Sequence, residues 1–174
     1  LGHFGINTPL TSYFEHNEKE KSVFLINKLK DGLKVALVSD AGTPGISDPG
    51  YRLVRRAIEN LIPVEPVPGP CALVALLTVS GFAIDSFTFK GFVPSGASVK
   101  KRFFLELKGS AQTYVMYESP RRLMKTLDVI HETLGDVYVV VGRELTKLHE
   151  EVLRDRVSAV KAFLKDRNIK GEVT

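Results

Sequence analysis

The spacing of hydrophobic and polar residues along this chain predicts strands and helices that follow one another. Short apolar or alternating runs predict strands at 10–14, 34–38, 86–93, 113–117, 137–141 and 150–154. Apolar residues at helical spacing predict helices near 15–31, 51–60, 71–79, 100–108, 120–133 and 157–165. Because strands and helices alternate, the sequence predicts an α/β fold with mainly parallel sheets and helices on their faces.

The loop Val38 to Gly50, VSDAGTPGISDPG, lies between a predicted strand and a predicted helix. Its three glycines and two prolines shape the backbone, since glycine permits positive φ and proline fixes φ. Ordinary connections of this kind have roughly 2–6 residues, so a longer one favours a ligand-binding role over a plain turn. The carboxyl end of a strand is also where open parallel sheets bind small molecules.

Two further motifs follow, PVEPVPGPCA at 63–72 and YESPRRL at 117–123. In the first, the turn Pro68-Gly69-Pro70 precedes a helix whose free backbone amides suit a polar or anionic group. With the central loop, these motifs resemble, across essentially the whole chain, the family of small-subunit ribosomal RNA 2′-O-ribose methyltransferases in the tetrapyrrole-methylase superfamily. Three motifs in the right order are more specific than one glycine pattern.

The resemblance implies two α/β domains with a cofactor cleft between them, and we expect the boundary at the PSGAS turn, giving domains 1–93 and 94–174. It implies S-adenosylmethionine as cofactor and a cytidine ribose 2′-hydroxyl of 16S rRNA as methyl acceptor, with either 16S rRNA or the small ribosomal subunit as the partner. It also implies a cytoplasmic homodimer. Compared with the family, a first strand, a loop and an acidic motif are expected before Leu1, and the end at GEVT is expected inside a final strand.

Carried onto this sequence, the resemblance nominates cofactor-binding residues from several segments. They are Asp40, Ala41, Gly42, Thr43, Ile46, Cys71, Ala72, Tyr117, Arg143 and Gly171. The family usually has serine where Cys71 stands, and a thiol donates a weaker hydrogen bond than a hydroxyl. Cys71 is either a reactive nucleophile or a small buried side chain, and the second role is the commoner one.

Methyl transfer to a ribose oxygen depends mainly on positioning, with a base accepting the proton late. Glu118 is the candidate for that base or for orienting the ribose; the alternative is that it binds helix amides or pairs with Arg121 or Arg122. The basic cluster Lys100, Lys101 and Arg102 is either an RNA-contacting edge or an exposed helix end. Arg121, Arg122 and Arg143 are candidate phosphate clamps.

The charged stretch EHNE at 15–18 predicts a solvated helix face; the resemblance implies, as the alternative, a role for this stretch near the RNA cleft, and His16 is the histidine nearest a plausible site. Asp48 is either a helix cap or a ligand contact. The net charge of +4 is weak support for an anionic partner, and 44% hydrophobic residues suffice for a core. One cysteine excludes a disulfide framework and fits a reducing cytosol. The four histidines show no metal-ligand spacing, and this chemistry requires no metal.

Two other functions remain open at this stage. The first is a superfamily methyltransferase that acts on a different acceptor, a tetrapyrrole or a protein side chain; the DAGTPGISDPG and YESP motifs argue against it. The second is a module that binds S-adenosylmethionine or RNA without catalysis. No G-x-G-x-x-G fingerprint follows a strand, and no phosphate-binding G-x-x-x-x-G-K-[ST] motif occurs, so other nucleotide-binding folds are not indicated.

Overall fold

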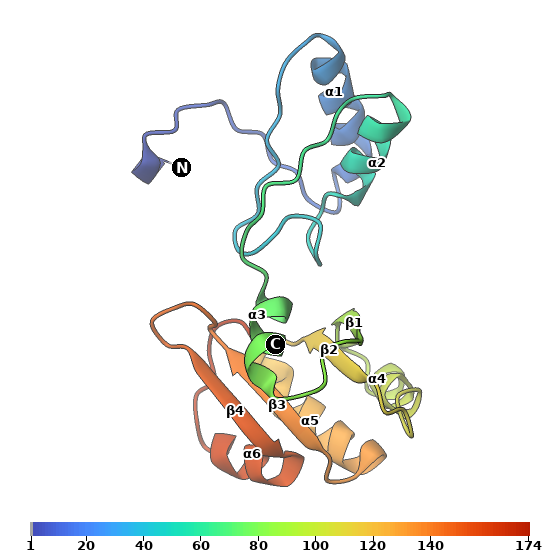
Figure 1. The fold of residues 1–174 in the computed structure, drawn as a ribbon, viewed down its shortest axis with the longest axis vertical. Helices are drawn as coiled ribbons and strands as arrows, with labels where there is room; N and C mark the ends of the chain where they lie inside the picture. The colour runs from blue at the N-terminus through green and yellow to red at the C-terminus, as the bar shows by residue number, and fades with distance from the viewer. Residues whose placement is uncertain (1) are drawn as a thin grey trace. The chain divides into compact units, whose positions relative to one another are not determined.

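The computed structural model describes residues 2–174 and contains two compact units (Figure 1). The N-unit ends at Pro70 and the C-unit runs from Cys71 to Thr174. The expected boundary after Val93 differs from this division. Strand β1 (Phe87–Phe92) pairs in parallel with β2 (Thr113–Tyr117), and a boundary after Val93 would separate two strands of one sheet.

The N-unit is built on two helices and long connections. A short 3₁₀ turn, η1 (Gly2–Phe4), comes before α1 (Glu18–Lys30) and α2 (Tyr51–Glu59). Leu25 and Ile26 of α1 pack against Leu53 and Ala57 of α2, with Tyr13 at the side of this cluster. Apolar spacing in α1 and α2 predicts buried faces that also include Val23, Phe24, Val54 and Ile58, but these four side chains are exposed. Both helices lie within about one turn of their predicted ends.

The strands predicted at 10–14 and 34–38 are wrong. Between Gly2 and Pro70 the structure contains no strand, and Val35 and Val38 are 38% and 62% exposed. An apolar run becomes a strand only where a neighbouring segment pairs with its backbone N–H and C=O groups. The pattern at 34–38 shows apolar residues but does not supply that partner.

The C-unit alternates helices and strands as predicted. Its elements in addition to β1 and β2 are α3 (Ala72–Ser80), α4 (Ala97–Leu105), α5 (Pro120–Leu134), β3 (Tyr138–Arg143), β4 (Glu151–Arg156) and α6 (Val157–Leu164). The mixed α/β class is confirmed. The prediction of mainly parallel sheets holds for β1 and β2, whereas β3 and β4 form an antiparallel pair.

The segment 172–174 joins the two strand pairs. Val173 forms antiparallel bridges to Glu118, just after β2, and to Arg143, the last residue of β3. Since β2 and β3 both run antiparallel to this segment, they run parallel to each other. The carboxyl ends of β1, β2 and β3 therefore lie at one edge of the sheet, which is the edge where open α/β sheets bind ligands.

Helices α5 and α6 form the main core of the C-unit together with β3. The buried residues of this core are Leu123, Leu127, Val141, Val157, Val160, Leu164 and Val173. Pro120 occupies the first turn of α5 and Ser119 is its N-cap residue, as predicted, although the Ser119 side chain makes no capping bond. This core fixes the strand ends that carry Glu118 and Arg143.

Candidate functional site

The glycine-rich loop of the N-unit is held by a side-chain hydrogen bond to a distant turn. The Thr43 hydroxyl donates to the backbone oxygen of Pro70 at 2.8 Å. Gly42 and Gly45 have φ of 72° and 85°, which other residues adopt at a cost. Asp40, Ala41 and Gly42 are exposed, and Ile46 is 40% exposed. The loop therefore presents its predicted cofactor residues at the surface of this unit.

A buried carboxylate fixes the other end of this loop. Glu18, only 8% exposed, accepts hydrogen bonds from the backbone N–H groups of Gly50 at 3.2 Å and Arg52 at 3.4 Å. Its other oxygen lies 3.1 Å from Arg52 Nε. Sequence reasoning left Glu18 inside a stretch expected to be a solvated face. The N-cap residue of α2 is Gly50, so Asp48 does not take the position of helix cap, which was one of its two predicted roles.

Two predicted cofactor residues of the C-unit come together in a small apolar cluster. Cys71 and Tyr117 both pack against the buried residues Leu73, Leu77 and Val115. The Tyr117 ring lies edge-on to Phe89, with centroids 4.9 Å apart. Cys71 is the half-buried N-cap residue of α3, directly before Ala72. These apolar surroundings favour the packing role for Cys71 over that of a nucleophile.

The strand order places Arg143, with the segment that contains Gly171 beside it, at the carboxyl edge of the sheet; both are predicted cofactor-binding residues. Arg143 Nη1 donates to the backbone oxygen of Lys170 at 3.3 Å, and its Nε lies 3.3 Å from Glu151 Oε2. Gly171 has φ of 87°, and a Cβ there would lie 2.3 Å from the carboxyl group of Glu144. The Glu172 N–H and Lys147 lower the pKa of Glu144. The guanidinium of Arg143 is thus already engaged by its own chain, which limits its use as a phosphate clamp.

Glu118 lies at the same edge, 5% exposed, within a network of charges. Its Oε1 lies 2.6 Å from Arg122 Nη2, and its Oε2 lies 3.7 Å from Lys100 Nζ and accepts from the Thr126 hydroxyl. Lys100 Nζ also donates to Thr126 Oγ1 at 2.7 Å. The predicted alternative, pairing with Arg122, is present. Both carboxylate oxygens have partners within the protein.

The predicted basic cluster divides into buried and exposed members. Lys100 is 4% exposed, so the expectation that it contacts RNA is wrong in this structure: its ammonium group faces Glu118 and Thr126. The helical spacing of α4 turns the next two residues, Lys101 and Arg102, outward, and both are exposed. Arg121 is exposed as well, and the Arg122 side chain is 30% exposed.

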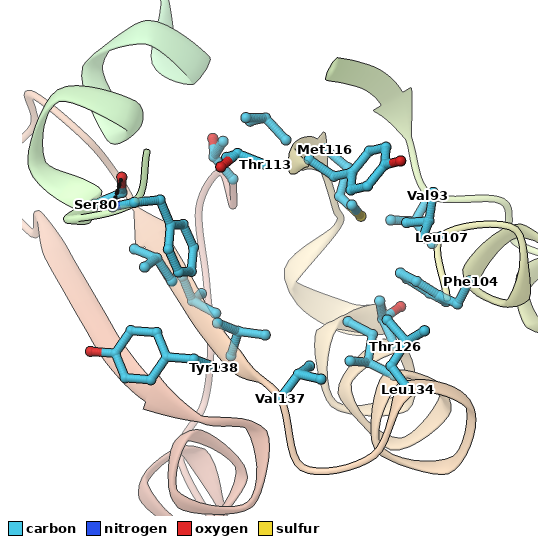
Figure 2. Close-up of a pocket in the computed structure, with 18 of the residues that line it drawn as sticks. Ser80, Val93, Phe104, Leu107, Thr113, Met116, Thr126, Leu134, Val137 and Tyr138 are labelled. Atoms are coloured by element: carbon cyan, nitrogen blue, oxygen red, sulfur yellow. Dashed lines mark hydrogen bonds between the residues drawn. The ribbon is translucent and has the colours of Figure 1, made fainter. Parts of the chain in front are cut away.

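A cavity of about 430 Å³ lies within the C-unit, between β2 and β3. Figure 2 shows Met116 and Phe104 on one side of it and Tyr138 on the other. Of the predicted site residues, Glu118 is the one that lines this cavity. Most of the residues that line the cavity are aliphatic or aromatic, so the cavity suits an apolar group. The predicted cofactor-binding residues do not line it.

Two kinds of site do not occur in the part of the chain that the structure describes. Residues 2–174 contain no group of three or more His, Cys, Asp or Glu side chains placed to hold a metal ion. Within the same residues, no helix combines the length and the apolar character needed to span a bilayer.

A model of the tetrapyrrole (corrin/porphyrin) methylases matches residues 3–161. The chain belongs to this family. The resemblance drawn from its three motifs is therefore confirmed. The crystal structure of the methyltransferase CobJ has a TM-score of 0.63 at 12% identity, covering 95% of this chain and 72% of that one. At so low an identity, the likeness shows the tetrapyrrole-methylase fold alone.

Members of the family with higher identity include proteins named ribosomal RNA small subunit methyltransferase I. That of Thermotoga maritima is 43% identical over 174 residues, which cover 100% of this chain and 78% of the relative. That of Pasteurella multocida is 43% identical, covering 99% of this chain and 63% of the relative. That of Halalkalibacterium halodurans is 45% identical, covering 99% and 60%. The chain thus spans less than two thirds of two of these three relatives.

Proposed function

We propose that this protein is an S-adenosylmethionine-dependent methyltransferase that methylates the ribose 2′-hydroxyl of a cytidine in 16S rRNA. The observation that carries the proposal is the 43% identity, over the full length of this chain, to a relative named ribosomal RNA small subunit methyltransferase I. The three sequence motifs that carry the resemblance support the same substrate. The proposal extends to the assembled small subunit as partner, to a homodimer and to a cytoplasmic location.

The residues of the glycine-rich loop fit a cofactor of this kind. S-adenosylmethionine supplies a methyl group activated by a sulfonium cation, together with a carboxylate, a ribose and a flat base. Gly42 and Gly45 carry no Cβ, so the backbone can approach a ligand closely, and backbone oxygens suit a nearby cation. Ile46 offers exposed apolar surface. We therefore assign cofactor contacts in the N-unit to Asp40, Ala41, Gly42, Thr43 and Ile46.

The C-unit supplies a second group of proposed cofactor contacts. Cys71 and Ala72 stand at the start of α3, where backbone N–H groups have no partner within the helix. The half-buried ring of Tyr117 provides an aromatic surface for a flat base. Arg143 and Gly171 complete this group; at Gly171 the Glu144 carboxyl occupies the space that a Cβ would fill, so the residue must stay without a side chain. Backbone contacts at residue 71 would tolerate cysteine in place of the serine usual in the family.

Of the two roles predicted for Glu118, the contacts support orientation over proton transfer. Its carboxylate holds Arg122, whose side chain remains partly exposed and can donate to a ribose or phosphate oxygen. A general base needs a free oxygen within hydrogen-bond reach of the hydroxyl that it deprotonates. We therefore propose that Glu118 positions Arg122 beside the acceptor ribose. The exposed residues Lys101, Arg102 and Arg121 would contact phosphates of the RNA.

Calorimetric titration of the chain with S-adenosylmethionine tests the cofactor assignment. Micromolar binding is expected, with a loss of at least tenfold in Gly42→Val, because a β-branched residue is strained at positive φ. The reaction is then tested with small ribosomal subunits and labelled cofactor, followed by mass spectrometry of the modified nucleoside. A methylated base, or transfer to protein, would contradict ribose methylation. Binding without transfer would favour a non-catalytic module.

A further inference from the structure

The stretch EHNE at 15–18 has contacts that the proposed function does not use. Asn17 Oδ1 accepts the Phe14 N–H at 2.9 Å, and its amide donates to the Ser12 oxygen at 3.2 Å. These bonds set the chain turn that leads into α1. Glu18 follows directly and is buried, which is unusual for a carboxylate near the first turn of a helix. A buried charge of this kind is retained where it has specific partners.

We propose that Glu18 is a positioning residue for the glycine-rich loop, acting on cofactor affinity through the start of α2. The proposal rests on the proposed function, since it assigns a further residue to the same cofactor site. Glu18 acts through the end of the loop, since its hydrogen-bond and ion-pair partners are Gly50 and Arg52. Gly50 is the residue at which the loop ends and α2 begins.

The geometry makes Gly50 a fixed point for the loop. A Cβ at Gly50 would lie 3.1 Å from a Leu37 side-chain carbon and 3.3 Å from the Gly45 Cα, so this position packs closely against Leu37, just before the loop, and against the loop itself. The Thr43 bond to Pro70 is the second fixed point. Because the loop is held at Thr43 and again at Gly50, the residues between these two points, Ile46 among them, keep one arrangement before a ligand arrives, which lowers the entropy lost on binding.

The charge of Glu18 suits this task. Helix N-termini carry free N–H groups and a partial positive charge, and a carboxylate satisfies both. Gly50 has no side chain that could cap α2 itself, and the structure records no side-chain capping bond from that position. The carboxylate reaches it from α1, 32 positions earlier in the chain. Removing Glu18 therefore leaves the buried N–H of Gly50 and the partly buried N–H of Arg52 without this acceptor at the end of the loop.

The test compares Glu18→Ala and Glu18→Gln with two controls. Glu18→Ala should weaken S-adenosylmethionine binding by about five- to tenfold, the size of a lost helix cap. It should raise KM for the cofactor without changing kcat at saturation. Glu18→Gln keeps an oxygen that can accept the Gly50 N–H, and should recover most of the affinity. Glu20→Ala, on the exposed side of the same helix, should bind like the parent.

A second control separates positioning from general stability. Ala57→Gly weakens the same α1–α2 core and should lower the melting temperature while leaving cofactor affinity unchanged. Hydrogen exchange supplies a readout that does not need the cofactor: Glu18→Ala should speed exchange at Gly50, Arg52 and residues 40–46. If the parent chain fails to bind the cofactor, the proposed function fails, while exchange still decides the positioning role. Unchanged exchange across 40–46, or equal loss of affinity in Ala57→Gly, would overturn it.

Discussion

The ionisation of Tyr13, which packs against the core of the N-unit, should make the stability of the fold depend on pH in the alkaline range. Burial, and next the charge of Glu18, raise the pKa of Tyr13 from 10.0 to about 12. In the unfolded chain the phenol ionises near its ordinary pKa, whereas in the fold it keeps its proton until about pH 12. The stabilising contribution of the neutral phenol is therefore complete below about pH 10 and is lost as the pH rises through the folded pKa.

The corresponding variant is Tyr13→Phe. Between about pH 10 and 12 the free energy of unfolding of the parent should fall more steeply than that of Tyr13→Phe, because only the parent has this linked proton. Urea titrations at several pH values, followed by circular dichroism, measure both slopes. Lysine and cysteine ionisation affects both proteins alike and cancels in the comparison. Identical slopes would show that Tyr13 titrates as it does in the unfolded chain.

Two glycines with similar φ angles allow the cost of backbone strain to be distinguished from the cost of side-chain crowding. Gly171 and Gly109 have φ of 87° and 81°; a Cβ at Gly171 overlaps the Glu144 carboxyl, while a Cβ at Gly109 meets nothing within 4 Å. Gly171→Ala should therefore lower stability by about 1 kcal/mol more than Gly109→Ala, since Glu144 must release the Glu172 N–H and Lys147. Thermal and urea unfolding of both variants checks this difference. Equal losses would mean that Glu144 moves aside freely.

At the scale of elements, the network around Glu118 connects α4, the end of β2 and α5. Lys100→Met leaves the buried carboxylate without one of its cations, and breaking a buried pair costs about 3–5 kcal/mol. Because Arg122 and Thr126 still contact Glu118, we expect a loss near the lower end of this range. The exposed neighbour gives the matched control: Lys101→Met should change stability by less than about 0.5 kcal/mol. Similar unfolding curves for the two variants would contradict a stabilising role for Lys100.

The sequence predicts the helices correctly, whereas the two strands that it predicts in the N-unit do not form. Apolar spacing within one segment decides which face of a helix is buried, so α5 and α2 were predicted to within a few residues. A strand depends on a partner elsewhere in the chain, and 34–38 has none in the described structure. The same reasoning explains Glu18. Its partners lie 32 and 34 positions away, and no local pattern encodes that distance.

At the scale of the whole molecule, three motifs far apart in the sequence were sufficient to recognise the family, and the family match over residues 3–161 agrees. They did not distinguish the residues that touch a ligand from those that hold the backbone in place. Lys100 and Lys101 are adjacent and chemically alike, yet helix geometry buries one and exposes the other. The assignment of the RNA surface therefore depends on the structure more than on the motif.

That assignment predicts how RNA affinity changes with salt. Each phosphate neutralised by a lysine or arginine contributes about −0.7 to −0.9 to the slope of log K against log salt concentration. Lys101→Ala and Arg121→Ala should each reduce the magnitude of the slope by about the contribution of one phosphate contact. Each should also weaken binding to small ribosomal subunits at low salt. Lys165→Ala, an exposed lysine at the end of α6, keeps the same net charge as either variant and should leave the slope unchanged. If all three variants shift the slope equally, RNA affinity depends on the overall charge of +4 and not on the exposed basic residues of α4 and α5.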